Sequence, residues 1–509
     1  MSSSRNINRN KYIAENLGEL RSQGYTVLSV KDEMRKNVLA MLGNGLAIDK
    51  MFPGIIGYSD SVLPALLNAI LSKHDFILLG LRGQAKTRIL RSLVQFLDEK
   101  IPVIAGTDLN ENPFEPITES ARSLILEKGD QTPIRWIDRS ERYQENLATP
   151  DVTIADLIGD IDPIKAATKR LSYTDEQVIH YGIVPRTNRG IFAINEVPDL
   201  PPRIQVGLLN VLEEKDFQIR GFPFRIPLDV CMVFSANPED YTNRGNIISP
   251  LKDRIDSQII THYPNDMKHA IQITSQEAWE NRSGDFEVYM PDVFREIIED
   301  VAFEARNSEF VDQKSGVSAR MTISLLENVI SNIERRCLTN KEEVACPRLS
   351  DLHQALPAIT GKLELVYEGE QEGPNLIARK LIGQAIKRTF LRYFPKPDVK
   401  IKDDKGQKTQ ESAYEKIIKW FAQGNTIEIS DKVSFEQYQN VLFRVTDLSE
   451  LVKKIFNVNE EKDIALGMEI TLEGLHQHSM LSKRDLDTGT SYRDMLKEMF
   501  GQMSQGENT

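Results

Sequence analysis

A turn that contains two glycines follows a short apolar segment early in the chain. Residues 76–79 read Phe-Ile-Leu-Leu, and residues 80–87 read Gly-Leu-Arg-Gly-Gln-Ala-Lys-Thr. Between a strand and a helix, such a turn directs successive backbone N–H groups toward one point and binds phosphate. Lys86 is spaced to reach the β and γ phosphates of ATP, and the Thr87 hydroxyl to bind Mg²⁺. The residues expected to bind nucleotide here are Gly80, Gly83, Gln84, Ala85, Lys86 and Thr87.

One position of this loop departs from the usual pattern, which has glycine immediately before the lysine. This chain has Ala85 there. A methyl group can fit if that residue has a negative φ, so the departure is a mild one. The alternative interpretation is a glycine-rich turn that only links a strand to a helix, and the segments downstream weigh against it.

A second apolar segment, Gly190–Asn195, ends in two polar residues, Asn195 and Glu196. An enzyme that hydrolyses a nucleoside triphosphate needs one carboxylate to support Mg²⁺ and a residue that orients the attacking water. Glu196 is the candidate for activating that water. Asn195 stands where the metal-supporting aspartate is expected, and its amide keeps an acceptor oxygen but carries no negative charge. The alternative is that Glu196 is an exposed residue after a core strand.

A third apolar segment and several arginines complete the set of candidate residues. Val230–Ala236 is followed by Asn237, whose amide can hold the attacking water beside the γ phosphate. Arg254 suits a finger that stabilises transition-state charge from a neighbouring subunit, and Arg244 is the competing candidate. Arg320 opens a helix in the expected lid region and could contact the nucleotide from above.

The elements that must position these residues divide the chain into five segments. A chain of 509 residues suggests three or four domains at roughly 100–200 residues each. Short apolar strands that alternate with helices predict a parallel sheet covered on both faces. The predicted strands are 76–79, 134–137, 191–195, 230–236 and 258–261. The predicted segments are an N-terminal helical segment at 1–48, an αβα nucleotide-binding core at 49–265, a helical lid at 266–395, a linker at 396–408 and a helical domain of unknown role at 409–509.

Composition narrows the function classes and the compartment. The net charge of −12 argues against a nucleic-acid-binding role, because phosphate binding depends on clustered cations. No apolar run approaches the roughly 20 residues that span a bilayer, and we expect neither a membrane span nor a secretory signal. The three cysteines form no metal-ligand spacing and no even disulfide set, so we expect a reducing cytoplasm.

Several further segments fit one family pattern together with these motifs. They are Pro53–Gly57, Gly106–Pro116, Ala148–Asp151 with Gly159–Asp162, Gly182–Gly190, and Leu208–Leu212 with a hairpin segment at Gln218–Arg220. Over roughly residues 50–335 the chain resembles an AAA+ ATPase. Within that group it is similar to the ATPase subunit I of magnesium chelatase and to the related MoxR-type ATPases. The resemblance assigns Ile56 and Gly57 to the adenine side of the nucleotide.

The resemblance implies a fold, an assembly and a partner. The fold is a P-loop NTPase core with a parallel sheet in the order 5-1-4-3-2, followed by a helical lid and here by a helical C-terminal extension. The assembly is a homo-oligomeric ring, often a hexamer, with ATP at the subunit interfaces. The partner is a protein that carries a von Willebrand A domain, as in the chelatase. Asn195 and the unrecognised segment 396–509 depart from the family pattern.

Four functions remain open at this point. The leading hypothesis is an ATP-hydrolysing subunit of the magnesium chelatase type, which serves remodelling or metal insertion by a partner. A MoxR-like chaperone with a von Willebrand A partner is the nearest alternative. An ATP-stabilised scaffold with little hydrolysis would follow from Asn195. A DNA-associated role is the least favoured, since the activator loop Gly-Ala-Phe-Thr-Gly-Ala is absent, although Arg220 and Arg225 could face a pore.

Overall fold

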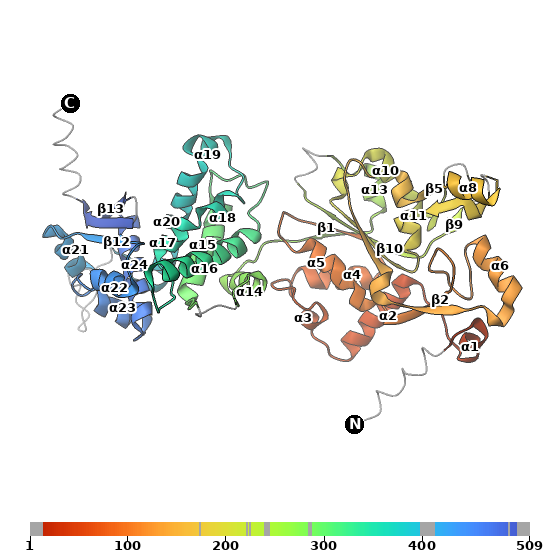
Figure 1. The fold of residues 1–509 in the computed structure, drawn as a ribbon, viewed down its shortest axis with the longest axis horizontal. Coiled ribbons are helices and arrows are strands. Elements are labelled where there is room, and N and C mark those ends of the chain that lie inside the picture. Colours follow the sequence, from red (N-terminus) through yellow and green to blue (C-terminus); the bar gives the residue numbers. More distant parts are fainter. Residues whose placement is uncertain are drawn as a thin grey trace, which may run out of the picture. The chain divides into compact units, whose positions relative to one another are not determined.

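The computed structural model describes residues 14–172, 175–219, 222, 225–238, 245–282, 288–397, 413–486 and 489–495. The chain divides into two compact units, Met1–Tyr263 and Pro264–Thr509, and each is described by itself. Among the described residues, no helix is both long and apolar enough to cross a membrane. Figure 1 labels the elements of both units.

A five-stranded parallel sheet forms the centre of the first unit. Its order is β11-β1-β10-β7-β4 (Figure 1). The strands are β1 (Phe76–Leu79), β4 (Tyr143–Leu147), β7 (Gly190–Asn195), β10 (Val230–Ala236) and β11 (Ser257–Ile260). All four pairings are parallel. Counted along the chain these strands run 5-1-4-3-2, so the expected sheet order is confirmed.

Helices cover both faces of this sheet. Successive side chains of a strand point to opposite faces, so a strand that is apolar throughout must be covered on both. Phe76 and Leu78 of β1 belong to one buried cluster, which includes side chains of α2 (Val30–Gly43), α4 (Val62–Leu71) and α5 (Lys86–Ser92). Ile77 and Leu79 belong to the cluster on the other face. Its helices include α7 (Ile154–Leu157), α9 (Ile183–Arg186), α10 (Pro202–Gly207), α11 (Leu209–Glu213) and α13 (Ser249–Arg254).

One expected strand lies outside this sheet. The apolar segment at 134–137 forms β3 (Ile134–Asp138), which pairs antiparallel with β2 (Lys100–Ile104) in a separate two-stranded sheet. The fifth strand of the main sheet is instead β4, whose residues Tyr-Gln-Glu-Asn-Leu are only half-buried or exposed. An edge strand buries little of its surface, so its sequence carries no continuous apolar run.

The remaining described elements of the first unit are short. The other helices are α1 (Leu17–Ser22), α3 (Ile48–Met51), α6 (Glu119–Lys128) and α8 (Pro163–Lys169). The 3₁₀ turns are η2 (Leu93–Phe96), η3 (Gly129–Gln131), η4 (Arg139–Arg142), η5 (Glu176–Val178) and η6 (Val197–Asp199). Two small antiparallel pairs are β5 (Gly159–Ile161) with β6 (Ile179–Tyr181) and β8 (Asp216–Phe217) with β9 (Ile226–Pro227).

The second unit is mostly helical and has one continuous hydrophobic core from Phe294 to Tyr492. Its first helices are α14 (Met267–Glu277), α15 (Asp292–Asn307), α16 (Arg320–Asn340), α17 (Leu349–Gln354), α18 (Leu356–Thr360), α19 (Tyr367–Glu372) and α20 (Pro374–Tyr393). The later helices are α21 (Glu415–Ala422), α22 (Phe435–Leu442), α23 (Leu448–Phe456) and α24 (Glu461–Gln477). The expected linker 396–408 lies almost wholly outside the described residues.

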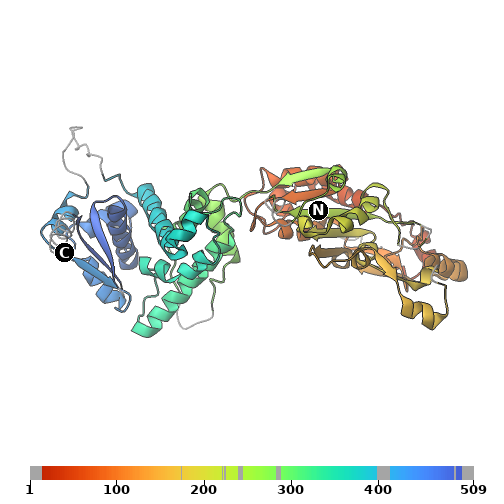
Figure 2. The ribbon, with the colours of Figure 1, turned by 90° about the horizontal axis from the view of Figure 1, so that it is seen from above.

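The C-terminal segment adds a sheet to the helices that its sequence predicts. β12 (Ile427–Ser430), β14 (Gly489–Asp494) and β13 (Leu481–Leu486) form an antiparallel sheet in that order, drawn in blue in Figure 2. The strands β13 and β14 are rich in polar residues, with Leu481 and Tyr492 buried in the core. With so few buried apolar residues, these segments show no periodic pattern that would distinguish a strand from a loop in the sequence.

Replacing Glu299 with glutamine is expected to flatten the pH dependence of the second unit's stability. Glu299 on α15 is 3% exposed and accepts a hydrogen bond from the Thr274 hydroxyl. Burial raises the pKa of this carboxyl from 4.5 to about 7. The folded state therefore holds a proton that the unfolded state releases first, and stability falls as pH rises from about 4.5 to about 7, by up to about 3 kcal/mol.

Calorimetric melting across that pH range measures this effect. The Glu299→Gln variant should melt at a higher temperature than the wild type above neutral pH, because no buried carboxylate forms. The same change at Glu309, which is exposed, should leave the pH profile unaltered. Identical profiles for wild type and Glu299→Gln would contradict the prediction.

Candidate nucleotide-binding site

The loop predicted to bind phosphate connects β1 to α5. Its first residue, Gly80, leaves β1 with its N–H donating to the Ala236 carbonyl oxygen at 3.2 Å. A Cβ atom on Gly80 would lie 1.9 Å from Thr261 Oγ1 and 2.2 Å from Gln84 Oε1, so only glycine fits there. Gly83 has a φ of +74°, in the region that favours glycine. The tight course of the loop therefore depends on both glycines.

Ala85 has a backbone conformation that its residue type disfavours. Its φ and ψ are +57° and +16°, at the N-cap position of α5. The negative φ that would make the alanine an easy substitute for glycine is therefore not found. A left-handed conformation costs a residue with a Cβ about 1–2 kcal/mol. The surrounding contacts hold the loop in the glycine-type shape in spite of that cost.

Lys86 is buried within the loop. It is 7% exposed, and its Nζ donates to the carbonyl oxygens of Gly80 at 2.5 Å and Leu81 at 3.1 Å. The ammonium group is thus held against the backbone of the same loop that the sequence assigns to phosphate. A phosphate bound there would replace or share these two carbonyl contacts. The role of Lys86 toward the β and γ phosphates stays a prediction.

The structure brings together the two residues predicted to support a metal. The Thr87 hydroxyl donates to Asn195 Oδ1 at 3.4 Å, and the Ser235 hydroxyl donates to the same oxygen at 3.0 Å. Asn195, at the end of β7, is 8% exposed. One amide oxygen therefore links the loop, β7 and β10. Oxygen ligands suit Mg²⁺, but this oxygen carries no formal charge.

The two residues predicted to act on water lie at the same edge of the sheet. Ile194 of β7 is opposite Phe234 of β10, and Leu79 of β1 is opposite Ala236. Glu196 and Asn237, which directly follow β7 and β10, therefore both stand at the carboxyl edge beside the loop. Glu196 is half-buried with a φ of +57°, and Asn237 is buried. A carboxylate and an amide next to a phosphate-type loop can orient water for attack on phosphorus.

Three side chains that the sequence did not identify hold this loop in place. The Tyr58 hydroxyl contacts the carbonyl oxygens of Gln84 at 3.0 Å and His262 at 2.7 Å. The Thr261 hydroxyl donates to Gln84 Oε1 at 2.7 Å, and the Tyr263 hydroxyl donates to the Arg82 carbonyl at 2.8 Å. Most of these contacts join residues far apart in the chain. Only Tyr58 had a signal, since it follows the predicted adenine-side residues Ile56 and Gly57.

The structure places Arg254 in the first unit and Arg320 in the second. Arg254 ends α13, where its Nε donates to Glu213 Oε2 at 2.6 Å and its Nη1 to the Pro250 carbonyl at 3.0 Å. Arg320 is the first residue of α16 in the second unit. Arg244 and Arg220 lie outside the described residues. The finger role of Arg254 and the nucleotide contact of Arg320 stay predictions.

Replacing Asn195 with aspartate is expected to strengthen the dependence of nucleotide binding on Mg²⁺. The change puts a negative charge on the side chain that lies 3.4 Å from the Thr87 hydroxyl, without altering its shape. The Mg²⁺ concentration that half-saturates ATP binding should fall by roughly tenfold. Titration of ATP binding with Mg²⁺ measures it, with the exposed Asn328→Asp as a control of equal charge. An unchanged Mg²⁺ midpoint would remove Asn195 from the metal site.

Comparison with known families matches part of this unit. The model of the Sigma-54 interaction domain matches residues 167–260, which include β7, β10 and β11. The fold is that of an AAA+ P-loop NTPase. The order of the five strands and the loop between β1 and α5 agree with it. This AAA+ core occupies the first unit, and the helical unit follows it.

Individual relatives cover little of the chain or resemble it weakly. The hydrogenase transcriptional regulatory protein HoxA of Cupriavidus necator is 33% identical over 98 residues, 19% of this chain and 20% of that protein. The chain thus spans about a fifth of that relative. A structure of subunits BchI and BchD of magnesium chelatase covers 63% of this chain and 98% of its own at 19% identity and a TM-score of 0.34. The structure of NtrX from Brucella abortus in complex with ATP covers 74% of this chain and 65% of the NtrX chain, at 13% identity and a TM-score of 0.33.

Proposed function

We propose that this protein binds Mg²⁺-ATP at the carboxyl edge of its sheet and hydrolyses it. One observation carries the proposal: the side-chain oxygen of Asn195 accepts hydrogen bonds from two hydroxyls. The Thr87 hydroxyl lies 3.4 Å from it and the Ser235 hydroxyl 3.0 Å. This contact joins the phosphate-type loop to the strand whose next residue is Glu196. Lys86 and Thr87 hold the nucleotide in this proposal, and Glu196 activates water with Asn237 positioning it.

The finer proposal is an AAA+ subunit that resembles subunit I of magnesium chelatase. Such a subunit forms a homo-oligomeric ring, with ATP at the interfaces and a von Willebrand A protein as partner. The motifs from Pro53 to Arg254 support it. Chelation requires a porphyrin-binding partner, whereas a MoxR-like chaperone requires only the von Willebrand A protein. The proteins encoded by neighbouring genes would separate the two.

A second candidate function is an ATP-stabilised scaffold with little hydrolysis. Asn195 favours it, because its oxygen supplies no negative charge to Mg²⁺ and already accepts two hydroxyl hydrogen bonds. The fate of bound ATP over hours, with and without Mg²⁺, discriminates the two functions. Rapid Mg²⁺-dependent conversion to ADP supports the hydrolytic function, and persistence of intact ATP with Mg²⁺ supports the scaffold.

Replacing Arg254 with alanine tests the predicted action across a subunit interface. If the arginine stabilises the transition state, turnover in the assembled protein should fall on the order of a thousandfold. Glu213→Ala is a matched control, since it breaks the same ion pair but keeps the arginine. Its turnover should stay near that of the wild type. Equal losses in both variants would show that the ion pair, and not the arginine's charge at the nucleotide, matters.

The similarity to a Sigma-54 interaction domain does not extend to the activator hexapeptide. The sequence Gly-Ala-Phe-Thr-Gly-Ala is absent from this chain. With a net charge of −12 the protein also offers little general attraction to nucleic acid. Binding to DNA that weakens steeply with salt would restore the hypothesis of a DNA-associated role.

A further inference from the structure

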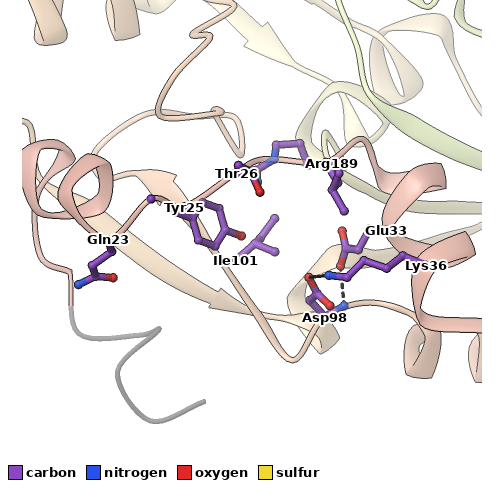
Figure 3. A pocket seen from close by; sticks show the side chains of 10 residues that line it. Gln23, Tyr25, Thr26, Glu33, Lys36, Asp98, Ile101 and Arg189 are labelled. Atoms are coloured by element: carbon purple, nitrogen blue, oxygen red, sulfur yellow. Dashed lines mark hydrogen bonds and ion pairs between the residues drawn. The ribbon is translucent and has the colours of Figure 1, made fainter. Parts of the chain in front are cut away.

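A cavity of the first unit lies at the amino ends of the sheet strands, whereas the candidate nucleotide-binding loop lies at their carboxyl ends. Its volume is about 450 Å³, within the range of small-molecule sites. Figure 3 shows side chains from its lining, among them Tyr25, Glu33, Lys36 and Arg189. Arg189 immediately precedes β7, so the cavity lies at the amino end of the strand whose carboxyl end bears Asn195. The length of β7 separates the two sites.

Arg189 is a buried cation without a carboxylate hydrogen-bond partner in the described chain. It is 4% exposed, with a φ of +60°. Its Nη1 donates to the Pro102 carbonyl oxygen at 2.7 Å and more weakly to that of Glu111 at 3.5 Å. Its Nε is buried and finds no acceptor among the described residues. A buried polar group of this kind is costly unless something binds it.

Three of the acidic groups near this guanidinium are already engaged. Both carboxylate oxygens of Glu33 accept from Arg142, at 2.7 and 2.6 Å. Asp229 accepts from the Val30 N–H at 2.9 Å. Asp98 accepts from Asn37 Nδ2 at 3.0 Å and lies 4.0 Å from Lys36 Nζ. These carboxylates therefore leave the Nε of Arg189 available to a ligand.

The atoms left over on Arg189 define what would bind. With Nη1 committed to a carbonyl, the Nε and Nη2 groups remain as one edge of the guanidinium. That edge donates two parallel hydrogen bonds and matches the two oxygens of a carboxylate or a phosphate. Burial, and then the charge of Arg142, lower the pKa of Arg189 to about 10, so the group is still charged at neutral pH. The guanidinium edge is positive and ready for an oxyanion.

We propose that this cavity binds a small molecule through a carboxylate or phosphate group seated on the Nε–Nη2 edge of Arg189. Lys36, which is about half exposed at the cavity, supplies a second cation. The remaining volume holds the body of the ligand beside Tyr25 and Ile101. Because Arg189 immediately precedes β7, occupancy would fix the amino end of the strand that carries the nucleotide site at its other end. The proposal does not depend on the ATPase activity.

Calorimetric titration with inorganic phosphate and with succinate tests this binding and separates the two head groups. The full-length Lys86→Ala variant is used, so that the nucleotide loop contributes as little anion binding as possible, and ionic strength is kept constant with chloride. We expect at least one probe to bind with a millimolar or tighter Kd. Adding Arg189→Lys keeps the positive charge but removes the bidentate pair of N–H donors. This change should weaken binding of the probe at least about tenfold.

Two surface variants keep the test decisive if Arg189→Lys fails to fold. Lys36→Glu reverses the charge at the cavity and should weaken binding severalfold. Lys128→Ala, exposed on α6, is the matched control and should not change it. Absence of binding for both probes would overturn the proposal. Equal binding in the parent, Arg189→Lys and Lys36→Glu proteins would also overturn the proposal. Neither result would bear on whether the protein binds ATP.

Discussion

Replacing Lys86 with alanine is expected to weaken ATP binding by roughly 100-fold or more, which makes it the most damaging single change to nucleotide binding. The ammonium group is 7% exposed and lies within the loop, so its charge is poorly screened by water. Its removal takes away a charged donor next to where the terminal phosphates would lie. Equilibrium titration with ATP measures the loss.

The control for Lys86→Ala separates binding from folding. Lys86 also donates to the Gly80 and Leu81 carbonyls, so the variant's melting temperature should be recorded beside its affinity. Lys128→Ala removes an equal charge from an exposed position on α6 and should bind ATP like the wild type. A folded Lys86→Ala protein that retains full affinity would refute the nucleotide site itself.

Replacing Glu196 with glutamine is expected to lower ATP turnover by roughly 10²–10³-fold and to leave ATP binding intact. Glutamine has the same shape but cannot take a proton from the attacking water. The left-handed backbone of Glu196 persists, because both residues pay the same conformational cost. Steady-state phosphate release measures turnover, and equilibrium titration confirms that the nucleotide still binds.

The comparison that matters for Glu196 is with a glutamate outside the site. Glu214→Gln, exposed at the end of α11, should keep the wild-type rate. If wild type and Glu196→Gln release phosphate at the same background rate in an assembled sample, the hydrolytic function is wrong. In that case the scaffold function, which Asn195 already favours, becomes the better account.

Together the two variants assign separate tasks to the two residues. In the proposed function, Lys86 acts on the bound ground state through its charge, whereas Glu196 acts only when water is deprotonated. Loss of binding in the first with retained binding in the second is the pattern of an ATPase. Asn195→Asp then reports how far the missing charge limits the metal.

The sequence by itself determined the local elements of the site. The loop at 80–87, the strand before it and the polar residues after the second and third apolar strands are encoded by short-range pattern. The three strands are confirmed, because a strand buried on both faces needs a continuous apolar run. The phosphate-binding role of the loop and the roles of the polar residues stay predictions. The order of the sheet also followed, through the resemblance that these motifs carry.

Only the tertiary structure decided features that depend on distant contacts. It chose the polar β4 over the apolar β3 as the fifth strand, because an edge strand need not be apolar. It set Ala85 in a left-handed conformation through its surroundings. It brought Thr261 and Tyr58 onto the loop and left the Nε of Arg189 buried without an acceptor among the described residues. Each of these features depends on packing between residues far apart in the chain, which no local sequence pattern encodes. Tertiary packing therefore determines the surroundings of the residues that the sequence pattern identifies.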